Sequence, residues 1–596
     1  MDGSRTDPAD AASEIYKFGK YYLNPAERRL AHDGNFIDIK PRTFEVLVYL
    51  VSNSGLTVTK DEILNVVWEG SFVEESNLAV HISRIRKIFE TTGAEGYIQT
   101  LSGSGYQFVE PIETVESEEW KKAVSGATPL VDPYGLDENR ESIAVMPLFN
   151  ENGDKDIDYL ADGMTEALIN NLSCRPDLRV IARNTVFKFK DEHIDVVEVG
   201  KRLNVSNVLT GRIRIANDDI SLSVELSKAE DGSQLWGEKF ERDFSEIFEM
   251  QDSITNSICE KLNAEIDRAA RRFPSQKHTK NTESYRLYLK GRYFVNNRRS
   301  KLDLDKAENL FQTSIALDPA FAPGYVELAN CLRVQFLYQK ILKQDAEERI
   351  LQLLENASQI DANFADLFVV KGYFEMFLRF NFDKAEILFQ KAIAINPGSA
   401  TAYNQLARLH IYRGATKDGL NMASESARLD PVSYSNDKSL AKIFLMTNQF
   451  QNAILRLEEC LELAPNDFEA MVLMGFALTE KGNHKEALEF YENALAIQYH
   501  HETIAMRSYT YGRMGRKKKA LEGIRNLEAA ALEEFVPSSF IAVAYSGLGR
   551  TEKVIQYLEL AYEEKYIDLA ALRVDPRWKS VRNHQKFKDL LSKIGI

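Results

Sequence analysis

The stretch from Ser76 to Lys87 has the hydrophobic spacing of an amphipathic α-helix. At about 100° per residue, four apolar side chains fall within one narrow arc and predict a buried stripe. They are Leu78, Ile82, Ile85 and Phe89. The opposite face and its flanks carry Ser76, Asn77, Val80, His81, Ser83, Arg84, Arg86 and Lys87. Such a helix can enter a DNA major groove, although a surface helix with a solvated charged face has the same pattern.

The surrounding residues, 14–112, have the patterns of a small α+β domain. Strands are expected at 15–23 and 35–39, helices at 43–53 and 60–68, and a β-hairpin at 97–109. Thr59 and Glu62 have the spacing of a capping box, which marks the start of the second helix. Strands, three helices and a terminal hairpin together predict a winged helix-turn-helix.

The amino-acid sequence of this domain resembles that of the OmpR/PhoB-type output domain. The matching stretches are 40–47, 62–68, 80–87, 98–101 and 103–108. The resemblance implies that the third helix reads bases of double-stranded DNA and that the hairpin, the wing, reaches the neighbouring groove. It also implies that the loop 68–73 touches RNA polymerase, and a plain connector fits that loop equally well.

Individual DNA contacts follow from the same resemblance by position. Val80 and Arg84 match base-contacting positions, and His81, Arg86 and Thr100 match phosphate-contacting ones. The expected DNA-binding set is completed by Asn77, Ser83, Lys87 and the wing residue Ser102. Ser76, Ser83 and Ser102 stand where relatives often have arginine, so this interface has fewer cations than is usual.

The charge balance argues against general binding to nucleic acids. The whole chain has a net charge of −15, and residues 1–112 carry 11 Lys and Arg against 16 Asp and Glu, a difference of −5. Because fewer cations release fewer DNA counterions, affinity from one domain should be weak. Tight binding is then expected to need a homodimer, tandem sites or a partner protein.

A second domain is expected at 141–270, after a disordered N-terminus at 1–13 and an acidic linker at 113–140. Strands are expected at 142–148, 178–182, 207–216, 220–229 and 234–242, and helices at 157–172, 196–203 and 244–266. This order predicts an α/β domain with a mixed sheet. Sequence segments such as IAVMPLFNENGD and VLTGRI resemble the TolB N-terminal-like domain. This resemblance implies a role in sensing or assembly and no known chemistry.

Two acidic clusters in this domain contain ligands of the kind that hold cations. They are Asp154 with Asp156 and Asp158, and Asp191-Glu192-His193 with Asp195. Neither has the spacing of an EF-hand, so solvated loop carboxylates are the preferred interpretation and neither a metal nor a cofactor is expected. The sequence also lacks G-x-S-x-G, HExxH and phosphate-loop motifs, so the chain is not expected to be an enzyme.

After a short linker at 271–281, residues 282–596 repeat with a period of 34. Pro397, Pro431 and Pro465 follow one another at this interval, and a small residue precedes each proline by 12 positions. The period slips between Pro319 and Pro397, which predicts an insertion near 332–345. Paired helices with this period are the tetratricopeptide pattern, so about eight units should stack into an all-α superhelix whose concave face receives a protein or peptide.

Taken together, these patterns predict a multidomain, cytoplasmic transcriptional regulator. The four cysteines are scattered and fit a reducing compartment, and no apolar run is long enough to cross a membrane. The domain of net charge −5 also fits an alternative, an interaction scaffold whose winged helix has lost DNA binding. The two hypotheses differ in whether the domain retains DNA in a salt-dependent way.

Overall fold

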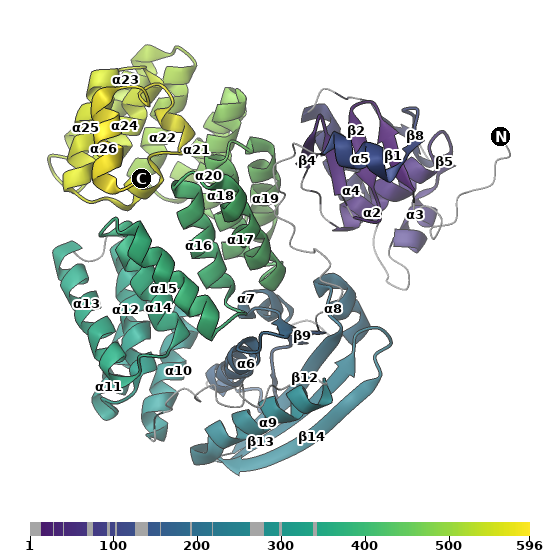
Figure 1. Ribbon diagram of the computed structural model, residues 1–596, viewed down its shortest axis with the longest axis vertical. Helices are drawn as coiled ribbons and strands as arrows, with labels where there is room; N and C mark the ends of the chain where they lie inside the picture. The colour runs from purple at the N-terminus through teal and green to yellow at the C-terminus, as the bar shows by residue number, and fades with distance from the viewer. Residues whose placement is uncertain are drawn as a thin grey trace. The chain divides into compact units, whose positions relative to one another are not determined.

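The computed structural model divides the chain into two compact units, Met1–Val131 and Asp132–Ile596 (Figure 1). It describes residues 14–27, 29–37, 39, 41–67, 75–91, 94, 96–101, 104–124, 141–154, 157–190, 194–216, 219–262, 279, 281–296, 301–337 and 343–596. The expected disordered N-terminus at 1–13 and the loop 68–73 lie outside the described residues.

The first unit combines an antiparallel sheet, three helices and a small wing sheet. The first sheet has the order β4-β3-β2-β1-β8, and the second has the order β5-β7-β6. The strands are β1 Ile15–Phe18, β2 Tyr21–Asn24, β3 Arg29–His32, β4 Asn35–Ile37, β5 Thr57–Val58, β6 Ile98–Leu101, β7 Gly105–Phe108 and β8 Glu113–Val115. The helices are α2 Pro41–Ser52, α3 Lys60–Val67 and α4 Glu75–Thr91. This arrangement confirms the predicted winged helix-turn-helix.

An aromatic cluster joins the three parts of this unit. The ring of Phe18 in β1 lies 6.0 Å from that of Phe89 in α4 and 5.1 Å from that of Phe108 in β7, both edge to face. Tyr21 stacks on Phe18 at 5.3 Å. Edge-to-face and offset pairs of this kind add to the free energy gained from burial alone. One core therefore fixes the sheet, the third helix and the wing together.

Local signals in the sequence explain where α3 and the wing begin. The amide of Thr59 donates to the Glu62 carboxylate at 2.8 Å, and the amide of Glu62 donates to the Thr59 hydroxyl at 3.2 Å, as the predicted capping box requires. Gly105 has a φ of 136°, and a Cβ there would lie 2.0 Å from the carbonyl oxygen of Val58. Only glycine allows β7 to pair with β5 this closely.

The predicted linker at 113–140 is wrong over its first eleven residues. Glu113–Val115 pairs with β1 as strand β8, and Ser117–Ala123 forms helix α5. Although this segment is mostly polar, it contains one buried apolar residue, Trp120. The Trp120 side chain is 1% exposed, and its indole nitrogen donates to Glu27 at 3.0 Å. The Glu119 carboxylate also pairs with Lys17 at 2.9 Å and accepts from the Tyr22 hydroxyl at 3.1 Å, so one apolar anchor and these polar contacts hold the short helix on the sheet. Residues 125–140 lie outside the described part of the chain.

The second unit begins with the predicted mixed sheet. Its order is β11-β9-β12-β13-β14, with β10 beside β12; β9 pairs in parallel with β11 and β12, whereas β12, β13 and β14 are antiparallel. The strands are β9 Glu141–Val145, β10 Phe149–Asn150, β11 Leu178–Val180, β12 Asn207–Ala216, β13 Asp219–Lys228 and β14 Gln234–Asp243. Its helices are α6 Asp158–Ser173, α7 Arg183–Val186, α8 Val196–Leu203 and α9 Ile247–Lys261.

The rest of the second unit is the helical superhelix, which in its described residues forms eight helix pairs. The pairs are α10 Thr282–Asn296 with α11 Lys301–Leu317, α12 Ala322–Leu337 with α13 Lys343–Ile360, α14 Ala365–Phe377 with α15 Phe382–Ile395, α16 Ala400–Tyr412 with α17 Thr416–Leu429, α18 Tyr434–Met446 with α19 Phe450–Leu463, α20 Phe468–Lys481 with α21 His484–Ile497, α22 His501–Arg513 with α23 Lys517–Ala530, and α24 Ser538–Gly547 with α25 Thr551–Glu563. The chain ends with η5 Ile567–Ala571, η6 Pro576–Trp578 and α26 Gln585–Ile594.

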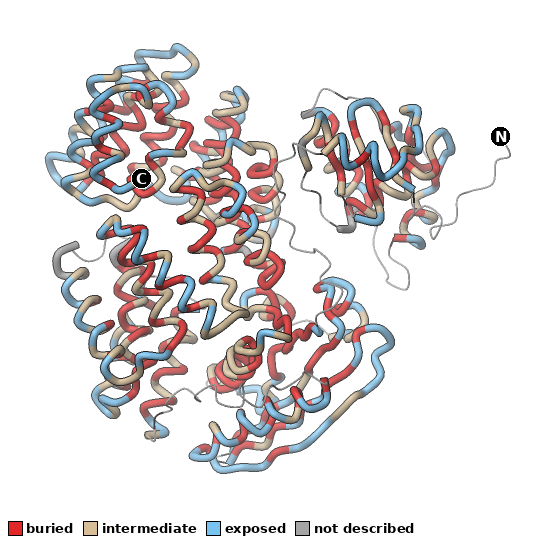
Figure 2. The backbone as a smooth tube through the Cα atoms, viewed as in Figure 1, coloured by how far each residue is buried: buried red, intermediate tan, exposed pale blue. Residues whose placement is uncertain are grey.

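The small residues that recur at the repeat spacing are buried between packed helices. Ala385, Ala453, Ala487 and Ala520 lie in the second helix of their pairs and are 0% exposed, so small residues occur where helices cross. The slip in the period falls at α12 and α13, whose 16 and 18 residues exceed the 13 and 14 of the next pair, α14 and α15. Figure 2 shows buried positions running along the facing sides of these helices.

The sheet domain and the superhelix pack as one body, which the sequence did not predict. The Thr185 hydroxyl donates to Asp430 at 2.8 Å, and the amide of Ala182 donates to the carbonyl of Leu429 at 2.8 Å. On α6, the buried Glu166 carboxylate pairs with Arg292 of α10 at 3.0 Å. Hydrophobic residues of both parts belong to one continuous core. The second predicted linker, 271–281, is described only at positions 279 and 281.

Among the described helices, none combines the length and the apolar composition that a span across a bilayer requires.

Candidate nucleic-acid interface

The position of helix α4 is set by its apolar stripe. Leu78, Ile82, Ile85 and Phe89 are at most 1% exposed, as the helical spacing predicts, and Ile88 at 2% adds to the stripe. These side chains face the core that α4 shares with α2, α3 and the wing. With the stripe buried on one side, the other face of α4 points away from the core.

That outward face contains the residues expected to read bases. Val80 is 42% exposed and is one of the few large hydrophobic side chains on the surface of this unit. Ser83 is exposed beside it, and Arg84 and Lys87 are half-buried at the flank. An exposed aliphatic side chain next to a serine and an arginine offers apolar contact to a thymine methyl group and donors to guanine.

Two of the residues expected to contact phosphates, Arg86 and Thr100, are joined to each other. Arg86 donates through Nη2 to the Thr100 hydroxyl at 2.7 Å and to the carbonyl of Ile98 at 3.0 Å, and Nε adds a 3.3 Å contact to the same carbonyl. Arg86 lies on α4, whereas Ile98 and Thr100 lie on β6 of the wing. This guanidinium therefore fastens the third helix to the wing, a role that sequence reasoning missed because it depends on tertiary contact.

The remaining expected residues have varied surroundings. His81 Nδ1 lies 2.8 Å from the hydroxyl of Thr43, which is buried at the start of α2. Asn77 lies in the first turn of α4, and Ser102 lies outside the described residues. The geometry thus brings Val80, Ser83, Arg84 and Lys87 to one face of α4, with His81 at its edge against α2.

The acidic clusters of the sheet domain have structural uses where they are described. The Asp158 carboxylate accepts from the side-chain amide of Asn150 at 2.9 Å. Asp195 caps α8 by accepting from the amides of Val197 and Glu198. Positions 155, 156 and 191–193 lie outside the described residues. Across the part of the chain that is described, no three His, Cys, Asp or Glu side chains gather as a metal site.

Three family models match separate parts of the chain. Residues 34–108 match the C-terminal domain of transcriptional regulatory proteins, residues 139–257 match the second domain of HilA/YgeH-like transcriptional regulators, and residues 468–501 match a tetratricopeptide repeat. The chain therefore carries an OmpR/PhoB-type winged helix, a HilA-like regulator domain and tetratricopeptide repeats. The resemblance of the sheet domain to the TolB N-terminal-like domain stays a prediction, because the matching family is the HilA-like one.

Individual relatives include two transcriptional regulators and one putative adenylate cyclase. The chain is 21% identical to the transcriptional regulator HilA of Salmonella typhi over 72% of each chain. It is 32% identical to the phosphate regulon transcriptional regulatory protein PhoB of Pseudomonas aeruginosa over 105 residues, 17% of this chain and 45% of PhoB. It is also 30% identical to putative adenylate cyclase 3 of Rhizobium meliloti (strain 1021) over 200 residues, which is 34% of each chain.

The chain thus spans only about a third of that cyclase relative, and both family models that match residues 34–257 describe transcription regulators. HilA and PhoB are named as transcriptional regulators, and this chain shares their type of DNA-binding domain.

Proposed function

We propose that the protein is a sequence-specific, DNA-binding transcriptional regulator in which α4 reads double-stranded DNA. The observation that carries this proposal is the outward face of α4, where Val80, Ser83 and Arg84 stand opposite a fully buried stripe. Val80 is 42% exposed on this face, beside Ser83 and Arg84. A thymine methyl group is a fitting contact for that side chain.

The other partners follow from the same organisation. The superhelix is proposed to receive a protein or peptide on the inner face of its repeats, and the loop 68–73 is proposed to contact RNA polymerase. Because the net charge of residues 1–112 is −5, one copy should bind weakly, and a homodimer or adjacent copies would supply the missing affinity. The cytoplasm is the expected compartment, because chromosomal DNA is the proposed target.

The proposal is tested with DNA fragments that the full chain retains from genomic DNA. Binding to one such fragment is measured by fluorescence anisotropy for the wild type, Arg84→Ala and Lys121→Ala. Both variants lose one positive charge in the first unit, but Lys121 lies on α5 and is 66% exposed. We expect Arg84→Ala to weaken specific binding by about tenfold to a hundredfold, the value of a good arginine–base contact.

Lys121→Ala should stay close to the wild type, since its charge is remote from α4. Equal affinity of Arg84→Ala and the wild type for the retained fragment would overturn the assignment of α4. Equal weakening by both variants would mean that only overall charge matters.

A scaffold without DNA binding is the second candidate function. The acidic balance of the first unit favours it. It predicts that no genomic fragment is retained above background at low salt. Catalysis is not proposed, because the matching families describe regulators.

A further inference from the structure

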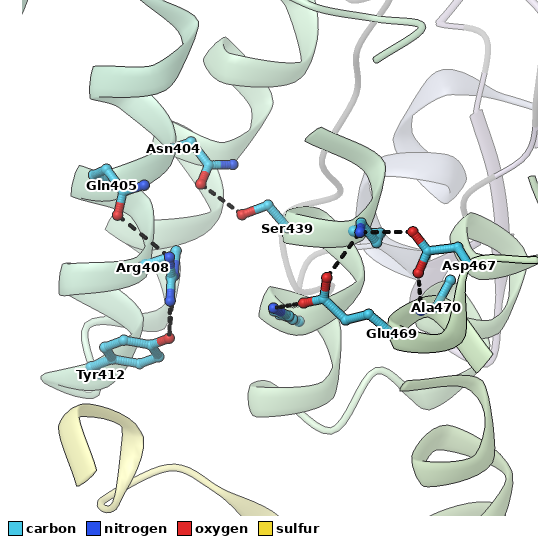
Figure 3. A network of polar contacts seen from close by, with 10 residues as sticks. Asn404, Gln405, Arg408, Tyr412, Ser439, Asp467, Glu469 and Ala470 are labelled. Atoms are coloured by element: carbon cyan, nitrogen blue, oxygen red, sulfur yellow. Dashed lines mark hydrogen bonds and ion pairs between the residues drawn. The ribbon is translucent and has the colours of Figure 1, made fainter. Parts of the chain in front are cut away.

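Charged side chains on the inner helices of the superhelix are matched by other residues of the chain (Figure 3). Lys442 and Lys438 donate to the two oxygens of the Glu469 carboxylate at 2.6 Å and 2.9 Å, and together they hold its pKa well below the usual range. Arg408 donates to the Tyr412 hydroxyl at 3.1 Å. These contacts join the repeats to one another. The outermost strand of the sheet domain carries its charges in a different setting.

Strand β14 forms the outer edge of the mixed sheet. Within the described residues it pairs only with β13, and Figure 1 shows its other side at the rim of the sheet. The strand runs for ten residues, Gln234–Asp243. Edge strands in proteins are often kept short, because their free amide and carbonyl groups can pair with another chain. A long free edge is therefore a surface to which a further strand can be added.

The charges of β14 alternate in sign on either side of its one buried residue. In order, its central residues are Glu238, Lys239, Phe240, Glu241 and Arg242. Phe240 is 8% exposed, whereas the four charged residues are exposed. The residues that face these four charges on β13 are all uncharged, namely Val224, Ser223, Ser221 and Ile220. Strand β13 therefore offers none of them an opposite charge.

The ion pairs that these residues form within the chain lie on its surface. Lys239 pairs with Glu241 of the same strand at 2.6 Å. Arg242 pairs at 3.3 Å with Glu246, in the short turn η3 (Phe244–Glu246) that follows the strand. The four side chains are between 47% and 67% exposed. Exposed pairs of this kind contribute little to stability, so an incoming strand can replace them at low cost.

We propose that β14 pairs antiparallel with β14 of a second copy of this chain, around a two-fold axis through Phe240. In this register Glu238 faces Arg242 of the second copy, and Lys239 faces its Glu241. Phe240 meets its own counterpart at the axis. Each pair occurs twice, so every charge of the two segments faces an opposite charge, which stabilises antiparallel strands. An interface of this kind is self-complementary and closes as a dimer.

Other registers of the same two strands do not match the charges. If the helices of both copies cover the same side of the joined sheet, the axis must pass through a residue, because side chains alternate between the two faces. An axis at any of the four charged residues then places two identical charges directly opposite each other, which is destabilising. The alternation thus selects one register, whereas charges that only protect an edge need no such order.

The proposed partner is a second copy because both halves of each charge pair come from the same strand. Self-association of this kind does not depend on DNA. Its use in regulation rests on the proposed function. A dimer carries two winged helices on one particle, and binding of the first to DNA raises the effective concentration of the second. This effect supplies the affinity that a DNA-binding region of net charge −5 lacks.

The test is sedimentation equilibrium of the full chain and of charge variants, in the absence of DNA. Lys239→Glu and Glu241→Lys each place like charges opposite one another, twice in every dimer. The double variant Lys239→Glu with Glu241→Lys restores opposite charges in the exchanged order. Glu225→Lys is the matched control, because it makes the same charge change at an exposed residue of β13, away from the free edge. Thermal unfolding of each variant shows that it folds.

We expect the wild type and Glu225→Lys to dimerise alike. The dissociation constant of each single variant should rise by about tenfold or more, since two attractive pairs become two repulsive ones. The double variant should recover most of the wild-type affinity. An equimolar mixture of Lys239→Glu and Glu241→Lys should associate more tightly than either variant alone, because positions 239 and 241 then face opposite charges again.

The proposal is overturned if the wild type stays a monomer at every concentration, since the edge would then be protected or kept for another protein. It is also overturned if the single variants dimerise like the wild type, if the mixture gains nothing, or if Glu225→Lys weakens the dimer equally. DNA retention is measured on the same preparations. A dimer that retains no DNA would refute only the proposed function, and a monomer that retains DNA would refute only this interface.

Discussion

Replacement of Arg86 tests whether this side chain fixes the wing relative to α4, so that both bind DNA as one rigid unit. Arg86→Ala removes the bonds from the guanidinium to the Ile98 carbonyl, at 3.0 Å and 3.3 Å, and to the Thr100 hydroxyl, at 2.7 Å. Each hydrogen bond to a charged group contributes roughly 1.5 to 3 kcal/mol when buried. Because Thr100 is exposed and water replaces part of the loss, we expect about 1 to 2 kcal/mol in all.

The assay is amide hydrogen exchange in the full chain. A local loss of about 1.4 kcal/mol makes opening roughly tenfold more frequent, so amides of β6 should exchange about tenfold faster in Arg86→Ala. Arg86→Lys is the decisive comparison. Lysine keeps the charge but has no planar fork, so it cannot hold both oxygens in the same way.

The two interpretations of Arg86 give opposite results for that lysine variant. If Arg86 positions the wing, Arg86→Lys should exchange nearly as fast as Arg86→Ala and should bind DNA about as weakly. If Arg86 only contacts a phosphate, lysine should restore binding. Unchanged exchange of β6 in both variants, together with wild-type DNA binding of Arg86→Lys, would refute the positioning role.

Two further outcomes are expected. Thr59→Ala removes half of the capping box and should destabilise α3 by about 1 kcal/mol, seen as faster exchange of its amides with no change in the repeats. Glu166→Ala removes the carboxylate that Arg292 shares with Arg183 and leaves Arg292 its 3.5 Å pair with Glu327. It should lower the unfolding free energy of the second unit by roughly 1.5 to 3 kcal/mol in urea titrations, whereas a change below about 0.5 kcal/mol would contradict the role of this pair.

Much of the architecture was predictable from periodicity alone. The stripe of α4 and the small residues of the repeats obey fixed spacings, and each spacing maps onto burial in the structure. The strands of the sheet domain followed from alternation, because β12 and β13 are long and exposed on one face. In these elements a local pattern decides which side chains are removed from water.

The features that were missed depend on contacts between distant residues. Helix α5 is held by one buried tryptophan and by contacts of Glu119 to the sheet, and no periodic signal in its polar sequence marks it. Thr185 and Asp430, which join the sheet domain to the superhelix, are 245 positions apart. Spacing within one element carries no information about such pairs.

The most direct test of the central claim is the ratio of specific to non-specific DNA affinity. The full chain is titrated against a retained genomic fragment and against the same fragment with its sequence scrambled, at several salt concentrations. Our account predicts a ratio of about a thousandfold or more at physiological salt, with both affinities falling as salt rises. Equal affinity for the two fragments, or no binding at low salt, would contradict the claim that α4 reads DNA sequence.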